Sequence, residues 1–376
     1  MLQPNPLRRL HALGQSVWLD YIRRDLVRGP ELGRMIRQDA LAGMTSNPTI
    51  FQKAIAESSL YDEDIARFSA RGLNAEEIYE RLAIADVTAA ADAFAGVWEE
   101  SGGNDGFVSL EVSPHLAHDA DRTIAEVKRL YNLCSRPNVM IKIPGTEAGL
   151  TAIREALFNG ISVNVTLLFS VGRYQDVLRY YLDGLDQRLS MKQPVRQIRS
   201  VASFFVSRVD TAVDARLVAV SKDSRFSATE RTLAFSLLHK AAIANARIAY
   251  QVFQEAFSSP IYNRLSQHAV AKQRPLWAST STKDPTLSDL FYVEALIGPD
   301  TVDTMPPSTL DAFRDHGWVE SRIDWDPQGS AQVVAELKAL GIDLATVGAE
   351  LEADGLKKFT ESYDSLIASI EAKRAP

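Results

Sequence analysis

The chain contains little sulfur and no long apolar run. Its 376 residues include one cysteine, Cys134, so no disulfide can form within the chain. Cys134 follows apolar residues at helical spacing, and we interpret it as a buried packing residue. No apolar run approaches the roughly 18 residues that a membrane-spanning helix needs, and the first ten residues lack the apolar core of a signal peptide. These absences favour a cytoplasmic protein.

The sequence also lacks a surplus of positive charge. Lysine and arginine number 41 against 48 aspartates and glutamates, which gives a net charge of −7. Proteins that bind nucleic acid usually carry a basic surplus that displaces counterions from phosphates, so we expect no nucleic-acid partner. A small phosphorylated substrate needs only two or three local cations. The six histidines are scattered without a strong third ligand nearby, so we expect no metal site.

What the chain does contain is a repeated alternation of short apolar runs and longer helical stretches. The expected strands are residues 16–20, 43–46, 106–112, 139–143, 162–167, 200–205, 276–279 and 301–305, and helical patterns cover 119–134, 146–159 and 229–257. This alternation predicts an α/β fold, a closed (β/α)₈ TIM barrel. An open doubly wound sheet is the alternative, although no G-x-G-x-x-G motif follows the first strand to favour its dinucleotide-binding version.

The domain organisation follows from the same pattern. We expect residues 1–376 to form a single barrel domain, since α/β barrels often reach this length without splitting. Residues 308–376 look helical and acidic. They are expected to form additional C-terminal helices that pack outside the barrel or across one rim.

Polar residues interrupt strands that should be apolar. Parallel strands buried on both faces normally read as Val, Ile and Leu. Here several strands carry a polar residue at or near the C-terminal end: Asp20, Asn47, Glu111, Lys142 and Asn164, with hydroxyls from Thr166, Ser203 and Ser279. Singly, each has an ordinary explanation as a cap, a turn former or a solvated edge residue. Together they favour an active site, because a barrel gathers these ends on one face.

The charged members of this set are suited to Schiff-base chemistry. A neutral Lys142 amine can attack a ketone carbonyl and form an imine, which then accepts electrons as the C3–C4 bond of a ketose breaks. Asp20 is expected to take the proton of the C4 hydroxyl. Glu111 is expected to move protons and water through the carbinolamine, with Thr166 holding the water.

The neutral and cationic members are suited to substrate binding. The amides of Asn47 and Asn164 are expected to bind substrate hydroxyls without adding charge. Arg208 lies just past the sixth expected strand and Lys283 just past the seventh, within a loop rich in serine and threonine. We expect these two cations to grip a phosphate, with hydrogen bonds from the loop hydroxyls.

At this point the motifs resemble those of the transaldolases, in the same order and over most of the chain. The matching segments are GQSVWLDYI (14–22), GMTSNPTIF (43–51), SLEVSPHLAHD (109–119), NVMIKIPGTEAG (138–149), GISVNVTLLFS (160–170) and SFFVSRVDT (203–211). The resemblance implies catalytic roles for Asp20, Glu111, Lys142 and Thr166, and substrate binding by Thr45, Asn47, Asn164, Ser203, Phe205, Arg208, Ser279 and Lys283. One position departs from the family: many members carry an arginine where this chain has Ser281, which leaves Lys283 as the nearest cation.

The resemblance also implies a reaction. Dihydroxyacetone would pass from sedoheptulose 7-phosphate to glyceraldehyde 3-phosphate, giving erythrose 4-phosphate and fructose 6-phosphate in the non-oxidative pentose phosphate pathway. No cofactor is implied, and we expect a monomer or a homodimer. One alternative is an aldolase like the fructose-6-phosphate aldolases, which carry glutamine where this chain has Glu111. The other is a non-catalytic sugar-phosphate-binding barrel, which would need at least one catalytic position to be lost.

Overall fold

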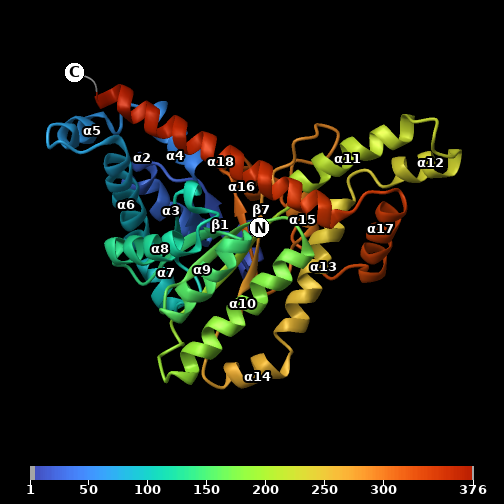
Figure 1. Ribbon diagram of the computed structural model, residues 1–376, viewed down its shortest axis with the longest axis horizontal. Helices are drawn as coiled ribbons and strands as arrows, with labels where there is room; N and C mark the ends of the chain where they lie inside the picture. The colour runs from blue at the N-terminus through green and yellow to red at the C-terminus, as the bar shows by residue number, and fades with distance from the viewer. Residues whose placement is uncertain (1–4, 375–376) are drawn as a thin grey trace.

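Eight parallel strands close into a barrel at the centre of the computed structural model, which describes residues 5–374 (Figure 1). The strands are β1 (Gln15–Asp20), β2 (Leu41–Thr45), β3 (Phe107–Glu111), β4 (Val139–Pro144), β5 (Val163–Leu168), β6 (Ser200–Phe205), β7 (Arg274–Ala278) and β8 (Thr301–Met305). Each strand pairs with the next in the sequence, and β8 pairs with β1. The predicted TIM barrel is therefore confirmed.

Helices surround this barrel. They are α1 (Pro6–Ala12), α2 (Arg24–Arg28), α3 (Pro30–Asp39), α4 (Pro48–Ala56), α5 (Asp62–Ser69), α6 (Ala75–Ala93), α7 (Ala95–Glu100), the 3₁₀ helix η1 (Pro114–Leu116), α8 (Ala120–Cys134), α9 (Glu147–Phe158), α10 (Val171–Ser190), α11 (Ser207–Lys222), α12 (Ala228–Ser236), α13 (Ala241–Ala256), α14 (Pro260–Ser266), α15 (Phe291–Ala295), α16 (Pro307–His316), α17 (Pro327–Ala339) and α18 (Leu344–Arg374). No helix within residues 5–374 is long and apolar enough to cross a bilayer.

The second strand gave only a weak signal in the sequence, and its packing explains why. A Cβ atom on Gly43 would lie 2.5 Å from the ring of Trp18, so the indole of β1 fills the space that a side chain of β2 would need. Glycine is required here for close approach and contributes no apolar signal of its own. The strand occupies 41–45, two residues earlier at its start than the prediction of 43–46.

The predicted helix at 229–257 is wrong as a single element. The chain forms α12 and α13 with a turn between them, in which His239 has a left-handed backbone (φ +62°). The Asp214 carboxylate accepts a hydrogen bond from the His239 backbone N–H at 3.0 Å. The apolar spacing continues through the turn, so periodicity alone could not reveal this tertiary contact.

The last helix, α18, runs across one side of the barrel in Figure 1. Two glycines let it approach the barrel closely: a Cβ on Gly348 would lie 2.8 Å from Ser170 Cβ, and a Cβ on Gly355 would lie 3.0 Å from Leu167 Cδ2. Both contacted residues belong to the end of β5 or follow it, so α18 lies over the C-terminal ends of the strands. This places Phe359 of α18 at the mouth of the barrel.

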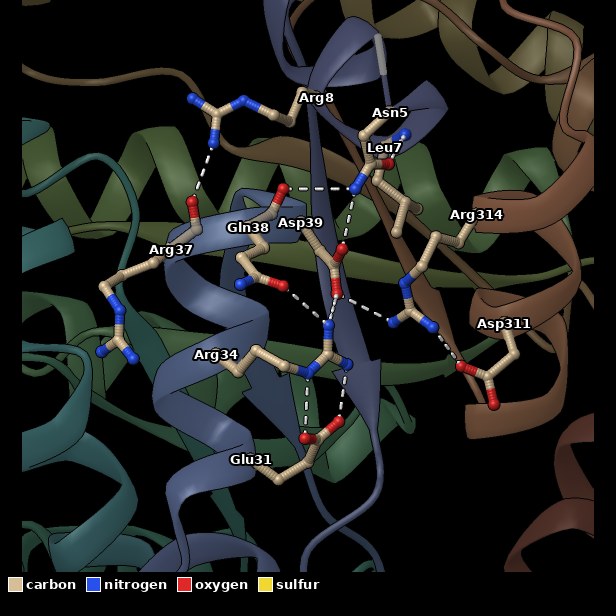
Figure 2. A network of polar contacts seen from close by, with 10 residues as sticks. All are labelled: Asn5, Leu7, Arg8, Glu31, Arg34, Arg37, Gln38, Asp39, Asp311 and Arg314. Atoms are coloured by element: carbon tan, nitrogen blue, oxygen red, sulfur yellow. Dashed lines mark hydrogen bonds and ion pairs between the residues drawn. The ribbon is translucent and has the colours of Figure 1, made fainter. Parts of the chain in front are cut away.

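The N-terminal end of the barrel is held by side-chain networks. Figure 2 shows one, in which Asp39, just before β2, accepts hydrogen bonds from Asn5 Nδ2 at 2.7 Å and Arg314 Nη2 at 2.8 Å. Arg34 also lies 3.7 Å from this carboxylate. Only 1% of Asp39 is exposed, so α1, α3 and α16 meet at one buried and fully partnered acid.

Candidate active site

The C-terminal strand ends enclose a cavity of about 210 Å³. Every predicted site residue except Glu111 and Asn164 lines it. The lining side chains are Asp20, Thr45, Asn47, Lys142, Thr166, Ser203, Phe205, Arg208, Ala278, Ser279, Ser281, Lys283, Thr304, Pro306 and Phe359. Residues distant in the sequence therefore meet where barrel enzymes place their chemistry.

Lys142 lies at the inner wall of this cavity and is 4% exposed. Its Nζ donates to the Ser46 carbonyl at 3.1 Å and lies 3.3 Å from Glu111 Oε2. The two residues are register partners on β4 and β3, so the pairing of the strands brings amine and carboxylate together. One buried amine next to one acid is the pair that imine chemistry requires.

Glu111 is nearly as buried as the lysine. Burial raises the pKa of its carboxyl to about 7, and the nearby Lys142 only partly opposes that rise. Neither carboxylate oxygen accepts an aligned hydrogen bond from a residue within 5–374. A carboxyl that titrates near neutrality can both give and take a proton, which suits a general acid and base.

Asp20 is held by a chain of hydroxyls. Thr45 donates to Asp20 Oδ1 at 2.7 Å, and Thr304 Oγ1 lies 2.7 Å from the same threonine oxygen. Because the single proton of Thr45 goes to Asp20, Thr304 must be the donor in the second bond. Burial raises the pKa of Asp20, while Lys142 and Arg208 oppose the rise. Thr304 was not predicted as a site residue, because a single threonine in a strand is common and β8 carries none of the matching motifs.

The two predicted polar residues of β5 lie at different depths. Thr166 lines the cavity, and its fully buried Oγ1 has no hydrogen-bond partner within the described residues. Asn164 lies lower in the barrel, where it donates to Ser109 Oγ at 3.0 Å and accepts from Ser203 Oγ at 2.7 Å. Thr166 therefore has a free hydroxyl that faces the cavity, whereas Asn164 supports Ser203 from below.

The opposite wall carries the cations. The Arg208 guanidinium lies 5.2 Å from the centre of the Phe205 ring, and its buried Nη1 has no hydrogen-bond partner within residues 5–374. Burial lowers the pKa of Arg208, which Asp354 and Asp20 partly oppose. Lys283 lines the cavity from the loop after β7 and is exposed. The predicted cations thus share one wall with Ser279, and both have donors available for an anion.

Two lining residues, the predicted Asn47 and the unpredicted Phe359, make contacts that the sequence motifs did not indicate. Asn47 caps α4 by accepting from the Ile50 N–H at 3.0 Å, so its side chain has a structural contact as well as a place in the cavity wall. Phe359 lies with its ring centre 5.9 Å from Lys142 Nζ. It is about 200 residues further along the chain than the lysine, and no local pattern around it indicates this contact.

A larger cavity, of about 410 Å³, lies between α6, α8 and α18 on the other side of Glu111. Its charged side chains largely satisfy one another, as where Arg129 donates to Glu80 and Glu126. Size alone therefore does not distinguish the candidate site, whereas the buried amine of Lys142 is found only in the lining of the smaller of these two cavities. Within residues 5–374, no group of three or more His, Cys, Asp or Glu side chains is placed to hold a metal ion.

Comparison with known proteins agrees with this geometry. The model of the transaldolase/fructose-6-phosphate aldolase family matches residues 17–370. A protein of Frankia alni named Transaldolase is 47% identical over 369 residues, covering 97% of this chain and 96% of its own. Transaldolase 2 of Nostoc sp. is 43% identical, covering 98% and 97%, and the Transaldolase of Mycobacterium bovis is 43% identical, covering 99% and 98%. The chain therefore belongs to the transaldolase/fructose-6-phosphate aldolase family.

Proposed function

We propose that this protein is a transaldolase that transfers dihydroxyacetone from sedoheptulose 7-phosphate to glyceraldehyde 3-phosphate. The products are erythrose 4-phosphate and fructose 6-phosphate. The observation that carries the proposal is the buried Lys142 amine, 3.3 Å from the Glu111 carboxylate, in a cavity that also holds Asp20 and two cations. The family and the names of its relatives give independent support.

The first step is imine formation at Lys142. The neutral amine adds to the C2 ketone of the donor, and the resulting carbinolamine loses water to give a protonated imine. Glu111 supplies the proton for the departing water and removes one when water returns at the end. A carboxyl whose pKa is about 7 is present in both forms near neutral pH, so it suits both directions. Thr166, with its free hydroxyl, holds that water.

The second step breaks the C3–C4 bond. Asp20 takes the proton of the C4 hydroxyl, the bonding electrons move into the protonated imine, and an aldehyde leaves while an enamine stays on Lys142. The enamine then attacks the carbonyl of the acceptor aldehyde, and Asp20 returns its proton to the new hydroxyl. The Thr45 hydroxyl, at 2.7 Å from Asp20 Oδ1, fixes the orientation of this base.

The substrate's phosphate needs cations at the end of the cavity far from the amine. Arg208 offers unpartnered guanidinium donors, and Lys283 adds a second positive charge from the loop after the adjacent strand, β7. The Ser279 hydroxyl also lines the cavity and lies 3.0 Å from Ser207 Oγ. Charge-assisted hydrogen bonds of this type hold sugar phosphates in a fixed position for the reaction.

Borohydride trapping tests the proposal directly. Incubation with fructose 6-phosphate and borohydride is expected to reduce the imine, inactivate the enzyme and add the mass of one reduced adduct to the intact protein. Peptide mapping is expected to place the adduct on Lys142, and Lys142→Ala serves as the negative control. An adduct on another lysine, or no adduct, would reject the role of Lys142.

The family also contains fructose-6-phosphate aldolases, which release free dihydroxyacetone. Two observations favour transfer: the aldolases that the chain resembles carry glutamine at the position of Glu111, and the relatives compared above are named transaldolases. Turnover of fructose 6-phosphate with and without an acceptor aldehyde separates the two reactions. Transfer predicts turnover that depends on the acceptor, whereas release of dihydroxyacetone at the same rate without acceptor would favour the aldolase.

A further inference from the structure

The loop between β7 and α15, residues 279–290, brings three lining residues to the cavity: Ser279, Ser281 and Lys283. Lys283 itself is exposed. The position of its ammonium group therefore depends on how the rest of the loop is held. The next residue, Asp284, contacts His239 in the turn between α12 and α13.

Asp284 uses its two oxygens differently. Oδ1 accepts from the backbone N–H of Thr286 at 2.8 Å and from the hydroxyl of the same residue at 2.7 Å, which closes a turn within the loop. Oδ2 faces away from that turn and lies 3.8 Å from Nε2 of His239. At this distance the contact is an ion pair of a doubly protonated imidazole rather than a hydrogen bond, and it brings the loop next to the turn between α12 and α13.

His239 is itself held by an acid on a third element. Asp214 of α11 accepts the His239 backbone N–H through Oδ1 at 3.0 Å, and its Oδ2 lies 2.8 Å from His239 Nδ1. Two contacts from one carboxylate fix both the left-handed backbone and the ring, so that Nε2 points toward Asp284. A carboxylate that orients an imidazole in this manner also determines which nitrogen faces the second partner.

The connection matters because α11 also carries Arg208, at its second residue. One imidazole therefore links the helix that bears Arg208 to the loop that bears Lys283. A second tie runs parallel to it: Asp210 of α11 accepts from the hydroxyl of Tyr292, just beyond the loop, at 3.0 Å. The two cations lie on separate elements whose relative position is set by these contacts.

We infer that His239 is a positioning residue for the phosphate group of the substrate. Through Asp214 and Asp284 it fixes the distance between Arg208 and Lys283, so that both cations reach one phosphate. The inference rests on the proposed function, because it assigns those cations to a substrate phosphate. It predicts an effect on phosphate binding without an effect on the chemistry at Lys142.

Kinetics of isosteric variants test this role. His239→Asn keeps a donor near the position of Nδ1 and tolerates the left-handed backbone, but it cannot reach Asp284. We expect KM for fructose 6-phosphate to rise about fivefold, which corresponds to ~1 kcal/mol, with kcat unchanged, because only the placement of the phosphate-binding cations is affected. Asp284→Asn should give the same rise, and the double variant no more than either single one. His239→Gln, whose amide reaches toward Asp284, should stay near the wild-type KM.

His316 provides a matched control. It makes a similar contact with Asp289 of the same loop at 3.1 Å, but neither residue lines the cavity. His316→Asn should therefore leave KM unchanged. Turnover of non-phosphorylated fructose should not change in any of these variants, because a general loss of structure would lower it and a phosphate defect would not.

A binding measurement makes the test independent of turnover. Inorganic phosphate should raise the Tm of the wild type, and the rise should be smaller in His239→Asn and Asp284→Asn but not in His316→Asn. Equal phosphate shifts in all four proteins, or KM effects of the two substitutions that simply add, would overturn the inference. Wild-type borohydride trapping separately decides the proposed reaction, so failure of one can be told from failure of the other.

Discussion

The two ends of the barrel differ in how their buried charged side chains are hydrogen-bonded. At the N-terminal end, Asp39 accepts from Asn5 and Arg314, and Asp105 accepts from Ser16 and Arg274, each at 2.8 Å or less. At the C-terminal end, Glu111 accepts no aligned hydrogen bond and Arg208 Nη1 has no partner within the described residues. Both ends are polar, and both leave single buried atoms such as Gln15 Oε1 and Arg314 Nε without a partner within residues 5–374, but only at the N-terminal end do both acids accept aligned hydrogen bonds from an arginine.

This difference indicates separate roles for the two ends of the barrel. An unsatisfied buried charge costs stability, so a cluster of such groups around a cavity favours a ligand-binding site. The polar groups at the N-terminal end form hydrogen bonds that join α1, α3 and α16 next to the strands, as Figure 2 shows for Asp39. Those at the C-terminal end remain available for a substrate. Substitutions at the two ends should therefore separate activity from stability.

The largest expected effect is on activity at the C-terminal end. Lys142→Ala should lower turnover by roughly 10⁴-fold or more, because the nucleophile is lost. It should not lower Tm, since Glu111, with its pKa near 7, can stay neutral once the ammonium group is gone. Steady-state turnover and a thermal melt check both expectations. A fall in Tm of several degrees would mean that the amine also stabilises the fold.

The next effect is a pH dependence of stability that arises from Asp303 of β8. Within residues 5–374 its side chain accepts one hydrogen bond, from the hydroxyl of Thr280 at 2.8 Å, and burial raises its pKa from 3.8 to about 7. Between these values the folded state keeps a proton that the unfolded state has lost, so stability falls as pH rises through this window. The loss should total roughly 4 kcal/mol and be complete above about pH 7, and about 3 kcal/mol of it should fall between pH 4.5 and pH 8.

Asp303→Asn isolates this contribution because it removes the ionisable group and keeps the shape. The free energy of unfolding in urea should be measured at pH 4.5 and pH 8. Between these two pH values it should fall by about 3 kcal/mol less in the variant than in the wild type. Parallel pH profiles for the two proteins would show that Asp303 titrates normally.

A smaller effect is expected at the N-terminal end. Asp39→Ala should lower the free energy of unfolding by about 3 kcal/mol, because it leaves Arg314 and Asn5 without their partner. KM and kcat of the folded enzyme should not change. Glu31→Ala is the matched control, since Glu31 pairs with Arg34 on the same network but is half exposed, and should cost below about 1 kcal/mol. Equal losses in the two variants would argue against a special role for burial.

The same contrast explains how far the sequence could predict the molecule. Lys142 was recognisable because an ionisable residue between Ile141 and Ile143 contradicts the pattern of a buried strand. The barrel followed from the alternation of strands and helices. Both signals can be recognised in short stretches of sequence, so neither depends on knowing which distant segments meet in the fold.

The contacts that the sequence did not reveal are those between distant elements. Phe359 reaches Lys142 only because Gly348 and Gly355 let α18 approach the barrel, and an apolar residue in a helix is ordinary in any fold. His239 breaks a predicted helix because Asp214 accepts its backbone N–H. Asn164 shares a register row with Lys142, yet the tilt of barrel strands places it below the cavity.

The smallest expected effect tests the assignment of Arg208 as a phosphate-binding residue. Arg314 donates to Asp39 through Nη2, whereas no acid within residues 5–374 accepts from Arg208, so Arg208→Ala should not lower the free energy of unfolding. KM for fructose 6-phosphate should rise about tenfold, which corresponds to ~1.4 kcal/mol, the lower range for a hydrogen bond to a charged group. KM for non-phosphorylated fructose should stay the same. If both substrates lost affinity equally, the guanidinium would be shaping the cavity wall with Phe205 rather than binding phosphate, and the unpartnered donor would have to be explained by another ligand.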